Sequence, residues 1–193
     1  MRNHYGEANM RYFITFAAAL GLLFVVLFLL FHKSGAPVVP QTQKALSSYS
    51  GTSAQAQLTI DGPINADQIH NVIQITVDSD SVTFDQLRGY QGTVVNTQTF
   101  ASNQSAYANF LLALARAGFT DGDNNPNLKD ERGYCPLGNR YIFRLSQGGS
   151  DIERYWATTC SGTKTYLGSL GITIALFQAQ VPTYETLTQN ISL

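Results

Sequence analysis

Charged residues are scarce in this 193-residue sequence. Lysine, arginine, aspartate and glutamate together make up 13% of it, and the formal net charge is −1, whereas about a quarter of the residues in an ordinary domain are charged. The few basic residues form no cluster, and proteins that bind nucleic acid depend on such clusters to neutralise phosphates. The composition therefore argues against a nucleic-acid partner.

Histidine and cysteine are equally scarce, which excludes several kinds of site. His70 is the only histidine after residue 32, and the two cysteines are Cys135 and Cys160. A serine or cysteine nucleophile normally needs a basic partner, and a structural zinc ion needs four ligands at a recognisable spacing. We therefore predict no catalytic residue and no cofactor, and we expect an ordinary surface or turn role for His70.

One long apolar run stands near the start of the sequence. It begins at Tyr12, ends at Phe31 and contains no charged residue. A helix of this length spans the roughly 30 Å hydrocarbon core of a bilayer. A cleaved secretory signal is the alternative, but its apolar region is usually only about 7–15 residues long, and Pro37 follows the small residues 34–36 where cleavage would occur. The run predicts an uncleaved membrane anchor.

The anchor divides the chain into four parts. Residues 1–11 form a short tail, 12–31 the transmembrane helix, 32–55 a flexible linker rich in serine, threonine and glutamine, and 56–193 one domain of ordinary size. The basic residues on the two sides of the helix are too evenly balanced to decide its orientation. A cysteine pair confined to the C-terminal domain favours a cytoplasmic tail and an extracytoplasmic domain in a single-pass protein of the plasma membrane.

The two cysteines flank a predicted hairpin. Residues 141–145 and 152–158 are typical of strands, and the glycine pair that starts at Gly148 is typical of the turn between them. With that pair at the centre of the turn, three favourable cross-strand pairs result: Tyr141 with Trp156, Leu145 with Ile152, and Arg144 with Glu153. The same register brings Cys135 and Cys160 close together at the open end, which favours a disulfide over two buried free thiols.

The remaining pattern predicts a mixed fold. Further strands are expected at residues 56–60, 72–77, 82–87 and 93–100. A helix capped by Asn103 or Ser105 should end near Gly118, and further helices are expected at 166–180 and 184–190. The sum is an α+β domain, an antiparallel sheet of about five to six strands with two helices packed on one face.

An acidic loop is a weak candidate for calcium binding. Four oxygen-bearing side chains alternate along it: Asp121, Asp123, Asn125 and Asn127. An EF-hand loop also needs glycine at its sixth position and glutamate at its twelfth, where this sequence has Pro126 and Arg132. A solvated turn is the stronger interpretation.

The cysteine-flanked hairpin and the adjoining loop 120–134 are the expected contact surface, because long loops often carry binding residues. The candidate residues are Tyr134, Arg140, Arg144, Arg154 and Trp156. The single tryptophan has two interpretations, a contact residue or a core residue. Strand alternation favours the core, on the same face as Ile152 and Tyr141.

Three segments carry a resemblance to known proteins. The segments CPLGNRYIF (135–143), RYWATTC (154–160) and LFQAQVP (176–182) resemble uncharacterised membrane-anchored extracytoplasmic proteins of ultrasmall, host-attached bacteria. The likeness covers roughly residues 133–183. It implies a bacterial envelope setting and a pairing of the two cysteines, and it transfers no catalytic residue, because such proteins have no assigned activity.

Together these features predict a non-catalytic extracytoplasmic domain with a binding or envelope-structural role and a protein or cell-envelope partner. Two alternatives stay open. One is an accessory subunit of a membrane complex. The other is an envelope hydrolase that uses calcium or paired carboxylates, with these candidates: Asp130, Glu131, Asp151, Glu153 and Glu185.

Overall fold

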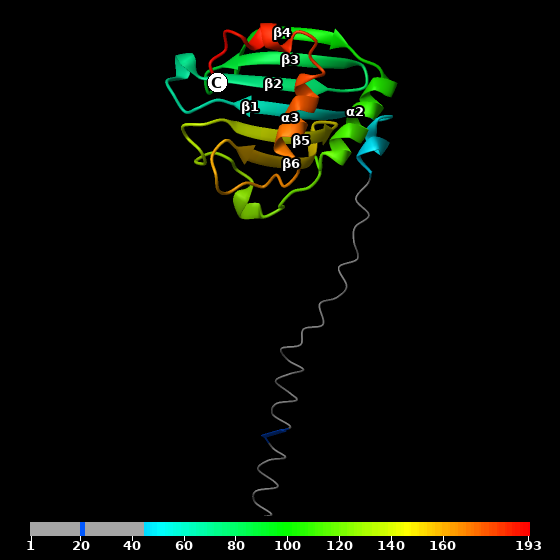
Figure 1. Cartoon of the computed structure of the whole chain (residues 1–193), viewed down its shortest axis with the longest axis vertical. Helices are drawn as coiled ribbons and strands as arrows, with labels where there is room; N and C mark the ends of the chain where they lie inside the picture. Colours follow the sequence, from blue (N-terminus) through cyan, green and yellow to red (C-terminus); the bar gives the residue numbers. More distant parts are fainter. Residues whose placement is uncertain (1–19, 22–44) are drawn as a thin grey trace, which may run out of the picture. The chain divides into compact units, whose positions relative to one another are not determined.

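A computed structural model describes residues 45–193 together with Leu20 and Gly21. The tail 1–11 and nearly all of the predicted membrane helix 12–31 lie outside the described residues. Within the described part of the chain, no helix is both long enough and apolar enough to cross a membrane. Residues 45–193 belong to one compact unit, which is drawn in colour in Figure 1.

The folded unit begins before the expected boundary at residue 56. A short 3-10 helix, η1 (Leu46–Tyr49), packs against the first long helix, α2. Leu46 is 4% exposed and belongs to the hydrophobic core. A single leucine among serines and threonines creates no periodic pattern, so its burial follows from contacts with residues far along the chain.

Six antiparallel strands form one sheet in the order β4-β3-β2-β1-β5-β6 (Figure 1). Their bounds are β1 Ala54–Asp61, β2 Asn71–Val77, β3 Ser81–Arg88, β4 Thr93–Ala101, β5 Arg140–Gln147 and β6 Ser150–Thr158. Each predicted strand is present and extends by at most two residues beyond either predicted bound. The predicted α+β class and antiparallel sheet are confirmed.

Three α-helices occur in residues 45–193: α2 Gln104–Arg116, α3 Leu170–Gln178 and α4 Tyr184–Thr188. The predicted cap of α2 is confirmed, because the Asn103 side chain accepts a hydrogen bond from Ala106 N at 2.9 Å. Helix α3 starts four residues later than expected, since Tyr166 lies in an isolated bridge with Gly122. Phe110 of α2 and Phe177 of α3 meet edge to face at 5.1 Å, so both helices share one core.

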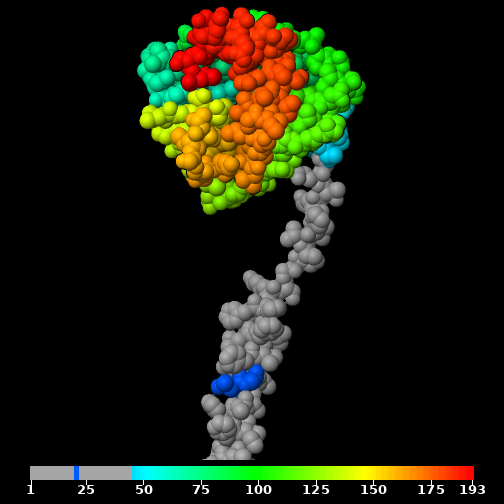
Figure 2. Space-filling view, in the orientation of Figure 1, coloured from blue at the N-terminus to red at the C-terminus, as the bar shows by residue number. Residues whose placement is uncertain are grey.

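The two faces of the sheet have different environments. One face, which includes Leu58, Ile75 and Phe84, is fully buried in the main core beneath the helices. Figure 2 shows residues 160–193, orange to red, lying across that covered side. The opposite side, here called the open face, carries the alternate residues of each strand, among them Thr59 and Gln74.

The hairpin register differs from the prediction. Next to the turn the pairing is as expected, but a bulge shifts the register between Leu145 and Ser146 and leaves Ile152 unpaired. As a result Trp156 lies opposite Ile142 and not Tyr141, while Leu145 faces Glu153. A one-residue shift moves every later side chain of a strand to the other face. The three predicted cross-strand pairs are therefore wrong, and Trp156 lies on the open face.

Candidate functional site

Trp156 lies in the interior, beneath the loop 120–134. Its side chain is 0% exposed. The indole Nε1 donates a hydrogen bond to Leu128 O at 2.6 Å, and the Tyr134 ring lies 4.8 Å from the indole. The loop therefore covers the tryptophan, and in this structure Trp156 cannot contact a partner.

Two of the predicted contact residues, Arg144 and Arg154, face each other across β5 and β6. Like charges in that position repel, and each arginine has its own acidic partner. Arg144 Nε lies 3.2 Å from Asp151 Oδ1, and Arg154 Nη2 lies 2.6 Å from Glu131 Oε2. Arg154 Nη1 also donates to Lys129 O at 2.6 Å. Arg154 therefore holds the loop 120–134 against the sheet.

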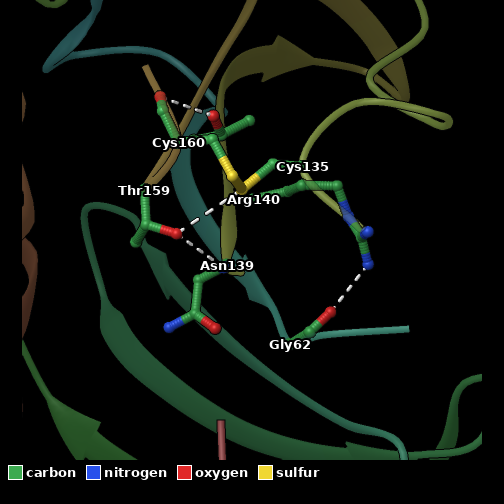
Figure 3. Close-up of a disulfide and its surroundings, with 7 residues drawn as sticks. Gly62, Cys135, Asn139, Arg140, Thr159 and Cys160 are labelled. Atoms are coloured by element: carbon green, nitrogen blue, oxygen red, sulfur yellow. Dashed lines mark hydrogen bonds between the residues drawn. A yellow bond between two sulfur atoms is a disulfide. The ribbon is translucent and has the colours of Figure 1, made fainter. Parts of the chain in front are cut away.

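The predicted disulfide between Cys135 and Cys160 is confirmed (Figure 3). Beside it, Asn139 N donates to Thr159 Oγ1, and Thr159 N donates to Asn139 O, both at 3.0 Å. Cys135 lies five residues before Arg140, the first residue of β5, and Cys160 lies two residues after the end of β6. The end of the loop 120–134 is therefore tied to the end of β6.

The acidic loop uses its side chains to hold its own backbone. Asp123 Oδ1 accepts a hydrogen bond from Asn125 N at 2.9 Å, and Asn125 Oδ1 accepts one from Asn127 N at 3.0 Å. The described residues contain no group of three or more His, Cys, Asp or Glu placed to hold a metal ion. Two of the four predicted oxygen ligands, Asp123 and Asn125, thus each accept a backbone hydrogen bond from their own loop.

A pocket of about 470 Å³ opens on the open face, at the end of the sheet where β1 stops and β5 starts. Strands supply its floor, and residues 62–70, 88–92 and 131–133 surround it. Five large apolar side chains line it: Ile64, Val72, Leu87, Tyr90 and Ile142. Mostly apolar walls around a few polar groups are typical of ligand pockets.

The floor contains a buried ionic network around Asp61, the last residue of β1. Asp61 Oδ2 accepts a hydrogen bond from Arg140 Nε at 2.8 Å, and Arg140 Nη2 lies at the same distance from this oxygen. Arg140 Nη2 also donates a hydrogen bond to Gly62 O at 2.7 Å. The Gly62 contact is visible in Figure 3. On the other side, His70 Nε2 lies 3.0 Å from Asp61 Oδ1, and His70 Nδ1 lies 3.1 Å from Pro63 O.

His70 does not occupy the expected surface position, because it is 2% exposed. Both of its ring nitrogens face oxygen acceptors, so neither is free to take a proton from a substrate. The network is neutral when the imidazole is neutral and carries one positive charge when the imidazole is protonated, since Arg140 balances Asp61. The geometry supports a structural and ligand-facing role over a catalytic one.

One donor of this network, Arg140 Nη1, has no hydrogen-bond partner within the described residues. Asp61 Oδ1 has only His70 Nε2 beside it, at 3.0 Å. Buried polar atoms are almost always hydrogen-bonded, and Arg140 is 3% exposed. The floor of the pocket therefore retains one unused donor, and a carboxylate oxygen with two lone pairs can accept a second hydrogen bond beside His70.

Tyr90 forms the outer wall of the pocket. Its ring stacks on His70 with the ring centroids 4.2 Å apart. Its backbone N–H donates to Asp67 Oδ1 at 2.7 Å, and its hydroxyl donates to Asn65 O at 2.8 Å. The preceding Gly89 has φ +73°, a conformation that glycine adopts at little cost. Tyr90 is thus held at both ends while half of it stays exposed.

Two carboxylates line the pocket, which bears on the hydrolase alternative. Asp61 accepts from Arg140, and Glu131 accepts from Arg154. Carboxylate-based glycosidases need one protonated member to act as the general acid, and neither group here is placed to donate a proton. Two other candidates, Asp130 and Asp151, likewise lie against Arg132 and Arg144. The geometry gives the hydrolase no support.

Sequence reasoning placed Arg140 on a contact surface and missed the pocket itself. The network joins residues 61, 70 and 140, which become neighbours only because β1 lies between β2 and β5. Asp61 faces Val72 on one side and Arg140 on the other. The turn after Asp61 was the only local signal, and it indicates a strand end but no site.

Comparisons with protein-family models, with curated proteins and with solved structures find no match for this chain. No activity or ligand is therefore transferred from another protein. The features of this chain that bear on function are the pocket, the disulfide and the apolar run at residues 12–31.

Proposed function

We propose that this protein is a binding domain, held at the outer side of the plasma membrane by the run 12–31, and that its ligand binds in the open-face pocket. The observation that carries the proposal is an apolar-walled pocket with a buried ionic floor whose hydrogen-bonding capacity is not exhausted. Its volume of about 470 Å³ falls within the usual range for small ligands.

The chemistry of the pocket favours a ligand with an apolar body and a carboxamide or peptide-amide end. The walls match the apolar body. Arg140 Nη1 offers a donor and Asp61 Oδ1 an acceptor. An amide matches both, because its carbonyl oxygen accepts a hydrogen bond and its N–H donates one. A carboxylate end would bring a second negative charge toward Asp61, which is partly accessible from the pocket, its side chain being 22% exposed.

The disulfide supports the extracytoplasmic part of the proposal, because such bonds persist in oxidising compartments and are rare in the cytosol. Labelling of intact cells with a membrane-impermeant thiol reagent tests it. We expect labelling of Cys135 and Cys160 only after reduction. Free thiols that react only after lysis would contradict the external location.

The pocket is tested with a matched pair of substitutions. Thr59→Phe fills the pocket from its floor, whereas Thr83→Phe places the same side chain on the open face of β3, outside the residues that line the pocket. The probe is 3-phenylpropionamide, observed by saturation-transfer NMR with the full chain in lipid nanodiscs. Protein-free nanodiscs measure the partition of the probe into lipid.

We expect Thr59→Phe to abolish the signal and Thr83→Phe to retain it. The acid, 3-phenylpropionate, should bind about tenfold more weakly than the amide, because it brings a second negative charge toward Asp61 and no N–H donor. Equal signals from wild type and Thr59→Phe would refute the site. Tighter binding of the acid would refute the amide preference while leaving the pocket in place.

A further inference from the structure

The two edges of the sheet are protected very differently. At the β6 edge, the segment that follows the disulfide satisfies the outward backbone groups of Trp156. Thr165 N and Tyr166 N both donate to Trp156 O at 2.9 Å, and Trp156 N donates to Thr165 Oγ1 at 2.8 Å. The rest of β6 carries charged side chains, which hinder pairing with another strand.

The β4 edge has no such cover. Its nine residues include no charge and no proline, and all except Asn96 and Phe100 are exposed. Within the described residues, the backbone of β4 is hydrogen-bonded only to β3. In an antiparallel pair, alternate residues direct both N–H and C=O away from the partner strand. The β4 edge therefore presents a row of unpaired backbone groups to the outside.

One protective device is present, and its position limits its effect. The register between β3 and β4 shifts between Gln86 and Leu87, which leaves Val95 unpaired as a bulge. Bulges of this kind twist an edge away from a partner. Residues 96–101 lie beyond the bulge and pair regularly with residues 81–86. Six consecutive residues of β4 are thus available for pairing.

We propose that β4 pairs antiparallel with β4 of a second copy of this chain, which joins the two sheets into one continuous sheet. A row of alternating N–H and C=O groups matches the backbone of another strand. A two-fold axis at Gln98 sets that residue against itself and places Thr97 opposite Thr99, so hydroxyls face hydroxyls and no like charges meet. Because the β4 edge carries no charge, charge complementarity does not favour a different partner. A second copy presents the same uncharged strand, and a two-fold symmetric interface places identical surfaces together.

Site-specific crosslinking of the full chain in membranes tests the pairing directly. The native cysteines are bonded to each other, so a cysteine introduced at an exposed position is the only free thiol. Facing residues of an antiparallel pair have Cα atoms about 4.5–5.5 Å apart, within disulfide range. Gln98→Cys should therefore give covalent dimers on mild oxidation.

The matched control is Gln189→Cys, at another exposed glutamine that follows α4. We expect at least tenfold more dimer from Gln98→Cys than from this control, with Thr97→Cys and Thr99→Cys locating the axis. Equal yields at all positions would overturn the proposal. Crosslinks from β4 to a different protein, without dimers, would overturn the choice of a second copy.

A charge-insertion variant provides an independent measurement. Gln98→Lys puts two ammonium groups against each other at the axis, while Gln98→Ser keeps the strand uncharged. Sedimentation of the full chain in detergent should show a dimer for wild type and Gln98→Ser. The dissociation constant of the dimer should be at least tenfold higher for Gln98→Lys. At a concentration low enough that all three are monomeric, where dimerisation adds no stability, the unfolding temperature should be the same, because residue 98 is exposed. A wild-type monomer at every concentration, or a dimer that the lysine leaves intact, would refute the pairing.

Discussion

Removal of the disulfide is the perturbation whose magnitude follows most directly from the structure. The bond joins residues 25 positions apart. Opening a loop of that length returns loop-closure entropy to the unfolded chain, worth about 3.5 kcal/mol at 25 °C. A domain of about 150 residues loses roughly 2–4 °C per kcal/mol. The double variant Cys135→Ser/Cys160→Ser should therefore unfold about 10 °C below the oxidised wild type.

Fluorescence of the single tryptophan is a suitable assay, because Trp156 lies beneath the loop that the disulfide closes. Its indole contacts Tyr134 and donates to Leu128 O, so exposure of the loop changes its emission. Thermal unfolding should be followed on the full chain for the oxidised wild type, the reduced wild type and the double variant. The reduced wild type serves as the control and should match the double variant within about 2 °C.

A decrease smaller than 2 °C in both reduced forms would refute the reasoning. It would mean that the contacts of the loop itself, the Arg154–Glu131 pair and the Trp156–Leu128 hydrogen bond, already restrict the reduced chain as much as the disulfide does. A decrease in the double variant alone would attribute the effect to the serine substitutions and not to the bond.

Three further changes test other parts of the domain. Trp156→Phe removes the hydrogen bond to Leu128 O and opens a small cavity, so urea denaturation should show a loss of about 2 kcal/mol, and Trp156→Ala about 4. Arg140→Met leaves Asp61 without its cation and should cost about 3 kcal/mol, part of which Arg140→Met/Asp61→Asn recovers. Burial and the bond to Glu153 raise the pKa of Tyr155 to about 12, so the unfolded state loses the tyrosine proton first. The contribution of Tyr155 to stability should be constant below about pH 10 and fall between about pH 10 and 12, so the loss of stability in that range should be less steep in Tyr155→Phe.

Most of the secondary structure was predictable because its causes are local. The alternation at residues 72–77 and 82–87 marks strands with one buried face, and Asn103 and Gly118 have the chemistry and conformation of helix ends. The disulfide was predictable for a similar reason, since a hairpin turn is a short-range feature and only two cysteines exist to pair. The membrane anchor likewise rests on an uninterrupted apolar run and stays a prediction.

The face on which Trp156 lies was not predictable, because one unpaired residue decides it. The bulge at Ile152 lets Trp156 pack beneath the loop 120–134, where Leu128 O accepts from its indole. Nothing in residues 150–158 alone distinguishes this register from the unbulged one, since both keep apolar residues on a buried face. The energy difference comes from a loop more than twenty residues away.

The positions of most strands and helices, the cysteine pair and the class of fold follow from the sequence alone, because hydrophobic period, caps and turns act over a few residues. The open-face pocket and the uncovered edge of the sheet depend instead on the tertiary structure. Asp61, His70 and Arg140 meet because two distant strands pair with β1. Among the described residues, no segment pairs with the outer side of β4, as residues 165–166 do at β6. Both depend on strand order, which long-range packing sets.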